Sequence, residues 1–188
     1  MSPPPLLRAS IAVALAAVAL LAGCGGDDDQ GGAPEVRANG TDAAFTAAMI
    51  PHHEATVDAA DLALSRAEHR ALERLAEGIV QFRSADLATL RTVRDVLGEA
   101  GLEEGDLGLS EAETGADLDL AGLRTAAAFD CAFLESMIPH HEAAIRIARA
   151  ELRSGIHAEL RRMSENIVDD YEFELRRMRS QRRSWCAG

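Results

Sequence analysis

Met49-Ile50-Pro51-His52-His53-Glu54 occurs a second time, 88 residues further on, as Met137-Ile138-Pro139-His140-His141-Glu142. The match continues without a gap on both sides of this hexapeptide. Further matching pairs are Phe45/Phe133, His69/His157, Leu72/Leu160, Ile79/Ile167, Val80/Val168, Asp86/Glu174 and Leu87/Leu175. A repeat of this length indicates that one structural unit is used twice.

Each repeat has the pattern of a helical hairpin, because apolar residues recur at helical spacing on both sides of the hexapeptide. The expected helices cover residues 42–66 and 68–97 in the first repeat, and 123–153 and 157–184 in the second. Thr41 is the candidate cap of the first helix, and Ser154-Gly155 is the expected stop between the last two. Four helices of this length predict an all-α, ferritin-like four-helix bundle.

Composition agrees with one helical domain. The 188 residues are 47% hydrophobic but only 4% aromatic, so the core is built mainly from aliphatic side chains. A formal net charge of -12 argues against nucleic-acid binding, which needs clustered positive charge. The arginines near the C-terminus are too few to change this expectation.

The N-terminus has the pattern of a secretory signal: Arg8, an apolar run over residues 11–21, and then small residues. Leu21-Ala22-Gly23-Cys24 resembles a bacterial lipobox, in which the cysteine is lipidated and becomes the first mature residue. Ordinary cleavage beside a spectator cysteine is the alternative. We therefore expect export, and anchoring by Cys24 to the outer face of the cell membrane.

Five segments follow from these patterns. Residues 1–23 form the expected signal peptide, and residues 24–40 form a flexible tether that begins with a run of Gly and Asp. The hairpin repeats are expected over residues 41–97 and 122–188. Between them, residues 98–121 are rich in Gly, Asp and Glu and are expected to form an exposed linker.

The remaining two cysteines are Cys131 and Cys186. If Cys24 is lipidated, these two are left as a pair in an oxidising compartment and could form a disulfide. Antiparallel packing of the last two helices would bring them together. Two buried free thiols, or two copper ligands, are the alternatives.

The hexapeptide itself is a candidate metal site. In each repeat the two histidines lie three and four residues after a methionine, so they flank the same apolar stripe of a helix. Imidazole and thioether donors together suit copper, especially Cu(I). The candidate ligands from these two helices are Met49, His52, His53, Met137, His140 and His141.

The second helix of each repeat adds a carboxylate to an otherwise apolar stripe, which in the first repeat is Leu72, Leu75, Ile79, Phe82, Asp86, Leu90, Val93 and Leu97. Glu174 is the equivalent of Asp86. A carboxylate in such a place needs a cation, a hydrogen-bond donor or a metal ion. Antiparallel pairing also brings Met178 to the level of His140 and His141, so Asp86, Glu174 and Met178 complete the candidate ligands.

A structural interpretation of the histidines is also open. Pro51 and Pro139 each remove one helical hydrogen bond and are expected to bend their helices just before the histidines. A neighbouring histidine could then simply bond to the freed carbonyl or to the carboxylate of the second helix, with no metal ion involved.

Residues 45–60 and 133–148, together with Ala128-Phe129-Asp130-Cys131-Ala132-Phe133-Leu134 and the lipobox, resemble the bacterial family catalogued as domain of unknown function 305. The resemblance covers nearly the whole mature chain. It implies a ferritin-like four-helix bundle, and it implies periplasmic copper binding linked to copper tolerance, as in some members. Many members have methionine in place of Ala59 and Ile147, and Gln and Glu where this chain has Arg83 with Asp86 and Tyr171 with Glu174.

The leading functional hypothesis is a non-catalytic, extracytoplasmic protein that binds or buffers copper, as Cu(I) or Cu(II), with an unidentified protein partner. An envelope structural or interaction domain with core histidines is the alternative. A ferritin-like metalloenzyme is a weaker one, because neither histidine pair has Glu three residues before it. We expect no enzyme activity.

Overall fold

The computed structural model describes residues 37–115 and 117–186, apart from the side chain of Glu111. The expected signal peptide, the lipidation site Cys24 and most of the tether lie outside the described residues. The helices are α1 (Gly40–Arg66), α2 (Arg70–Glu99), α3 (Glu111–Thr114), α4 (Leu120–Thr125), α5 (Phe129–Ser154) and α6 (Ala158–Trp185). No strand occurs in this part of the chain, so the all-α prediction is confirmed.

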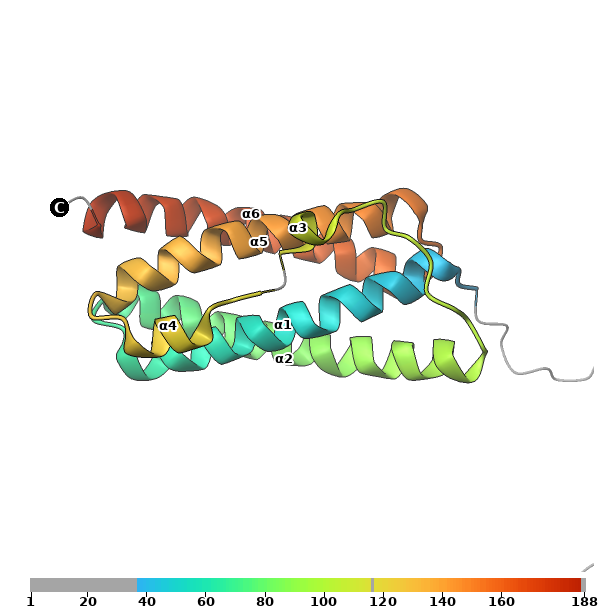
Figure 1. Ribbon diagram of the computed structural model, residues 1–188, viewed down its shortest axis with the longest axis horizontal. Helices are drawn as coiled ribbons and strands as arrows, with labels where there is room; N and C mark the ends of the chain where they lie inside the picture. The colour runs from blue at the N-terminus through green and yellow to red at the C-terminus, as the bar shows by residue number, and fades with distance from the viewer. Residues whose placement is uncertain (1–36, 116, 187–188) are drawn as a thin grey trace, which may run out of the picture. The chain divides into compact units, whose positions relative to one another are not determined.

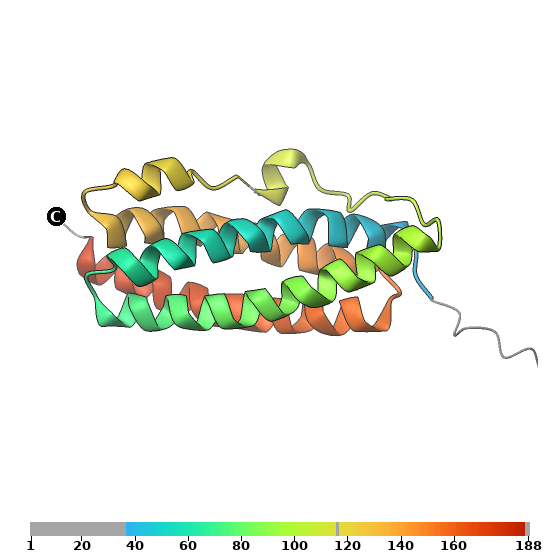
Figure 2. The same ribbon diagram turned by 90° about the horizontal axis from the view of Figure 1, so that it is seen from below.

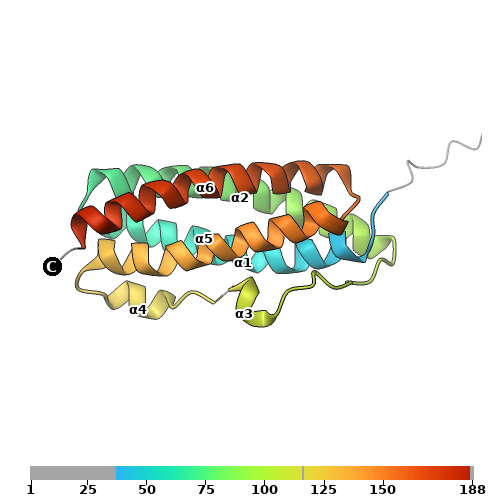
Figure 3. The same ribbon diagram turned by 90° about the horizontal axis from the view of Figure 1, so that it is seen from above.

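The four long helices form the predicted bundle of two hairpins (Figure 1). α1 packs on α2, α5 packs on α6, and the hairpins meet mainly through α1 and α5. α2 and α6 contact each other at few places. Seen from the side, α1 and α5 form a central layer, with α2 and α6 on one side and the connecting segment that contains α3 and α4 on the other (Figure 3).

Two aspartates join the hairpins by binding the turn of the other hairpin. The carboxylate of Asp42, in α1, accepts hydrogen bonds from the backbone amides of the two residues just before α6, and Asp130, in α5, does the same just before α2. The amides are those of Ile156 and His157 (3.0 and 2.9 Å) and of Glu68 and His69 (both 3.0 Å). Because these residues are repeat equivalents, the hairpins are related by a pseudo-two-fold axis.

The start of α1 differs from the prediction. Asn39, not Thr41, is the cap: its side-chain oxygen accepts from the amides of Thr41 and Asp42, at 3.0 and 3.2 Å. In return the Asp42 carboxylate accepts from the amide of Asn39, which completes a capping box. The expectation for Thr41 was wrong because the helix begins two residues earlier, at Gly40.

The prediction of a single helix over residues 123–153 was also wrong, because two helices, α4 and α5, take its place. Arg66 explains the break. Its guanidinium donates to three carbonyls at the end of α4, those of Leu123, Arg124 and Ala126. These carbonyls are satisfied from outside the helix, so α4 ends there.

The segment expected as an exposed linker is partly packed against the bundle. It contains α3 and lies along the α1 and α5 side (Figure 2). Gly105 donates its amide to the carbonyl of Gly40 at 2.8 Å, and a Cβ atom at residue 105 would lie 2.8 Å from the Gly40 carbonyl carbon. The attachment follows from partly buried leucines that contact the core: Leu102, Leu107, Leu109, Leu118 and Leu120.

A disulfide joins Cys131, near the start of α5, to Cys186, at the end of α6, across a sequence separation of 55 residues. It closes the second hairpin at the end opposite its turn. Within the described residues, no helix is both long and apolar enough to span a membrane.

Candidate functional site

The four hexapeptide histidines meet in the middle of the bundle, with exposures of 2% or less. His52 from α1 and His140 from α5 stack face to face, with ring centres 3.6 Å apart and an interplanar angle of 11°. The Nε2 atom of each ring lies near the backbone oxygen of the other residue, at 2.9 and 3.2 Å. These two residues are repeat equivalents in direct contact, so the pseudo-two-fold axis passes between them.

His140 has two further polar neighbours. Its Nε2 lies 3.0 Å from the Thr56 hydroxyl, which donates to the backbone oxygen of His52, and its Nδ1 lies 3.0 Å from the carbonyl oxygen of Gly115. Burial, reinforced by His141, lowers the pKa of His140 to about 4. Burial also lowers the pKa of His52, and His140 adds to this effect. Both rings are therefore neutral at pH 7, and each has only one N–H to donate.

The second histidine of each hexapeptide faces a carboxylate of its own hairpin. His141 Nε2 lies 2.8 Å from Glu174, and His53 Nε2 lies 3.5 Å from Asp86, a distance too long for a good hydrogen bond. Burial raises the pKa of each carboxyl, but the adjacent histidine and Arg83 outweigh it, so both carboxyl pKa values are lower than usual. Burial lowers the pKa of His53, although Asp86 partly opposes this.

Arg83 is the main site residue missing from the candidate ligands and from the predicted stripe. The stripe was expected to bury Phe82, but the Phe82 side chain is 55% exposed and Arg83 is 1% exposed. The spacing alone could not separate the two residues. Phe82 continues a regular alternation from Leu72 through Leu75 and Ile79, and Arg83 continues an equally regular one from Leu72 through Ala76 and Ile79.

Tyr171, the repeat equivalent of Arg83, was also not a predicted ligand and lies directly against it. The Arg83 guanidinium is 4.5 Å from the Tyr171 ring centre. The ring stacks on His141 at 4.1 Å, and its hydroxyl lies 3.5 Å from His53 Nδ1. Burial raises the pKa of the Tyr171 hydroxyl, so the phenol stays protonated. Arg83 and Tyr171 are the second equivalent pair in contact across the axis.

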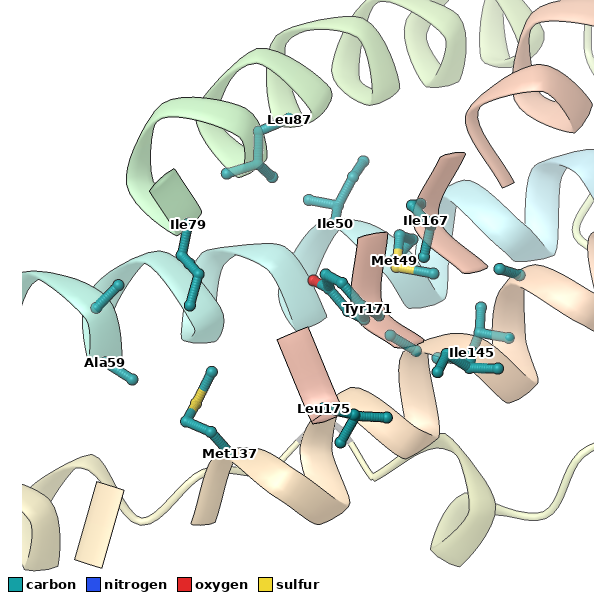
Figure 4. Packing of buried hydrophobic residues seen from close by; sticks show 14 of the residues in the cluster. Met49, Ile50, Ala59, Ile79, Leu87, Met137, Ile145, Ile167, Tyr171 and Leu175 are labelled. Carbon is teal, nitrogen blue, oxygen red and sulfur yellow. The ribbon is translucent and has the colours of Figure 1, made fainter. Parts of the chain in front are cut away.

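The three methionines among the candidate ligands are all fully buried: Met49, Met137 and Met178. Figure 4 shows Met49 from α1 and Met137 from α5 directed into the core, with Tyr171 from α6 also there. Met137 and Met178 lie one helical turn beyond His141 and Glu174 in the same antiparallel register. Leu90 replaces the second methionine in the first repeat.

Three imidazole nitrogens in this cluster are buried and have no hydrogen-bond partner among the residues that the structure describes: His52 Nδ1, His53 Nε2 and His141 Nδ1. Buried polar atoms are usually paired, so such a group of unpaired atoms indicates a functional role. Within residues 37–115 and 117–186, no three His, Cys, Asp or Glu side chains converge to hold a metal ion. Imidazole and thioether donors lie on the same helices, and this donor type suits a soft ion.

Residues 42–182 match the family described as "Domain of unknown function (DUF305)". The chain is a DUF305 protein. No curated protein sequence matches this DUF305 protein.

Several solved structures resemble this DUF305 protein. CopM in its Cu(I)-bound form has 28% sequence identity and a TM-score of 0.66, covering 78% of this chain and 98% of CopM. The Cu(II)-bound form has 26% identity and a TM-score of 0.67, covering 77% and 97%. A putative secreted DUF305 protein from Streptomyces coelicolor has 21% identity and a TM-score of 0.61, covering 73% and 88%, and supports the fold alone.

Proposed function

We propose that this DUF305 protein binds copper as cargo at the histidine cluster, outside the cell membrane, and buffers the ion or passes it on without catalysing a reaction. The proposed donors are His52, His53 and His141, which have an unpaired ring nitrogen, together with Met49, Met137 and Met178, and His140 holds His52 in place by stacking on it. Asp86 and Glu174 contact His53 and His141, and they supply negative charge beside the site.

The observation behind this proposal is the set of three unpaired imidazole nitrogens. Each of these nitrogens is held in the core, and the lone pair of an imidazole nitrogen is the group that binds a metal ion. Buried methionines on the same helices add soft donors. The likeness to CopM, which has been solved with Cu(I), Cu(II) and Ag bound, supports copper as the ion.

The test is a competitive Cu(I) titration of residues 35–188, the compact unit that contains the whole core, against a chromophoric chelator. We expect tight binding that a Met137→Leu substitution weakens about 10-fold or more, because it removes a thioether at nearly constant volume. Met163→Leu, a methionine of α6 outside the candidate ligands, is the matched control and should have no effect.

A His140→Ala/His141→Ala variant sets the background of the titration. If the unaltered protein binds Cu(I) no more tightly than this variant, copper binding is ruled out. The histidines would then be core structure in an envelope domain. The stack of His52 on His140, with its bonds to backbone oxygens, is the observation that favours this second function.

The lipid anchor rests on the sequence around Cys24, which is outside the described residues. In cells fed with a labelled fatty acid, we expect the full-length protein to incorporate the label and a Cys24→Ala variant to lose it. Equal labelling of the two proteins would contradict the proposed anchor.

A further inference from the structure

We propose that Arg83 makes the candidate copper site selective for a monovalent metal ion over divalent ions. The inference rests on the proposed function and adds to it the residue that determines the charge of the accepted ion. It starts from an unusual feature, which is a permanently charged side chain in the centre of a site expected to accept a cation.

Arg83 is placed between the two histidine–carboxylate pairs. Its Nη1 donates to Asp86 at 2.9 Å, and Asp86 faces His53. Its Nη2 lies 3.6 Å from Glu174, the partner of His141. The guanidinium also lies over the Tyr171 ring, and its side chain is only 1% exposed. One fixed positive charge therefore neighbours both pairs.

The formal charges of this group decide which ion fits. Arg83 contributes +1, and Asp86 and Glu174 contribute -1 each, so these three side chains together have a net charge of -1. Asp170 also meets Arg83, at 3.4 Å, but its side chain is 53% exposed, so water screens its charge.

A monovalent ion brings the group to neutrality, whereas a divalent ion leaves an excess positive charge among buried side chains. Such a charge is costly to desolvate. Without Arg83 the net charge would be -2, which a divalent ion would neutralise. Soft imidazole and thioether donors already favour Cu(I), and Arg83 adds an electrostatic penalty against Cu(II) and Zn(II).

The experiment compares Cu(I) and Zn(II) affinities, each measured by competition with a chromophoric chelator, for residues 35–188 and three variants. Arg83→Gln and Arg83→Met both remove the charge, and the second keeps a long side chain against Tyr171, so either can be used if the other fails to fold. Arg83→Lys keeps the charge. Circular dichroism melts verify folding.

Removing the charge should shift the ratio of Zn(II) to Cu(I) affinity toward Zn(II) by about 10- to 100-fold, the effect of one nearby unit charge at intermediate dielectric. Arg83→Lys should stay within about threefold of the unaltered protein on the same argument. A purely structural arginine would change both affinities together and leave the ratio constant. An unchanged ratio, or a lysine variant that behaves like the glutamine variant, overturns the proposal.

The two proposals fail in different ways. If the unaltered protein does not bind Cu(I), the proposed function fails. The role of Arg83 is then supported if the charge-removing variants gain Zn(II) binding, and is overturned if they do not.

Discussion

At the scale of single residues, Glu151 is a buried acid whose environment disfavours its charged form. It lies fully buried on α5, and neither carboxyl oxygen has a hydrogen-bond partner among the described residues. Burial, together with the neighbouring Asp42, raises its pKa to about 8. Its carboxyl also occupies the space that a Cβ atom at Gly155 would need. The equivalent residue in the first repeat is Ala63, so the hairpin itself does not require an acid here.

Replacing Glu151 by Gln should therefore stabilise the protein at neutral and alkaline pH. The folded protein holds this proton more tightly than the unfolded chain, so the stability that it contributes is complete below pH 4.5 and falls as pH rises toward 8. We expect the variant to gain about 1–3 kcal/mol above pH 8 and nothing near pH 4. Urea denaturation across this range measures the difference.

The matched control is Glu165→Gln, an exposed glutamate of α6. Its stability difference from the unaltered protein should be small at every pH. A constant difference for Glu151→Gln between pH 4 and 8.5 would show that the Glu151 pKa is not raised.

At the scale of elements, the reciprocal contacts of Asp42 and Asp130 hold the two hairpins together at opposite ends. Each aspartate satisfies two backbone amides in the turn of the other repeat, and Asp130 also lies 2.7 Å from the His69 ring. An Asp130→Ala variant should lose about 1–3 kcal/mol of unfolding free energy, because two amides just before α2 lose their acceptor. Denaturant unfolding measures it.

Glu135→Ala, an exposed acid on the same helix, separates loss of this contact from loss of negative charge. If both variants lose the same unfolding free energy, the contact of Asp130 with the other hairpin contributes little to stability.

The repeat made most of these elements predictable, because two copies of one hydrophobic pattern specify two hairpins and their antiparallel register. It also predicted that Glu174 would lie beside His141. It could not predict the break between α4 and α5, which depends on Arg66, a residue about 60 positions away in the chain. Nor did it predict that Arg83 rather than Phe82 is buried, because the partner that makes this possible, Tyr171, lies in the other hairpin.

At the scale of the whole molecule, the disulfide closes the second hairpin. The first hairpin has no equivalent, because Cys24 is the only other cysteine in the sequence and precedes both hairpins. A Cys131→Ser/Cys186→Ser variant should lose about 4 kcal/mol of stability in the chain-entropy model for a loop of this length. We expect a lower thermal midpoint but an unchanged copper stoichiometry. A loss of copper binding in the folded variant would show that the Cys131 and Cys186 thiols bind copper, and would contradict a purely structural disulfide.

The contact between Arg83 and Tyr171 on the pseudo-two-fold axis has a consequence for how such a site can arise at all. Two separate copies of one hairpin, paired symmetrically, would place every axial residue opposite itself: arginine against arginine, or tyrosine against tyrosine. An odd number of charges at the centre is impossible in that arrangement. When the two hairpins are fused into one chain, their sequences can differ. Substitution in only one half can then produce a site with a net charge of one unit.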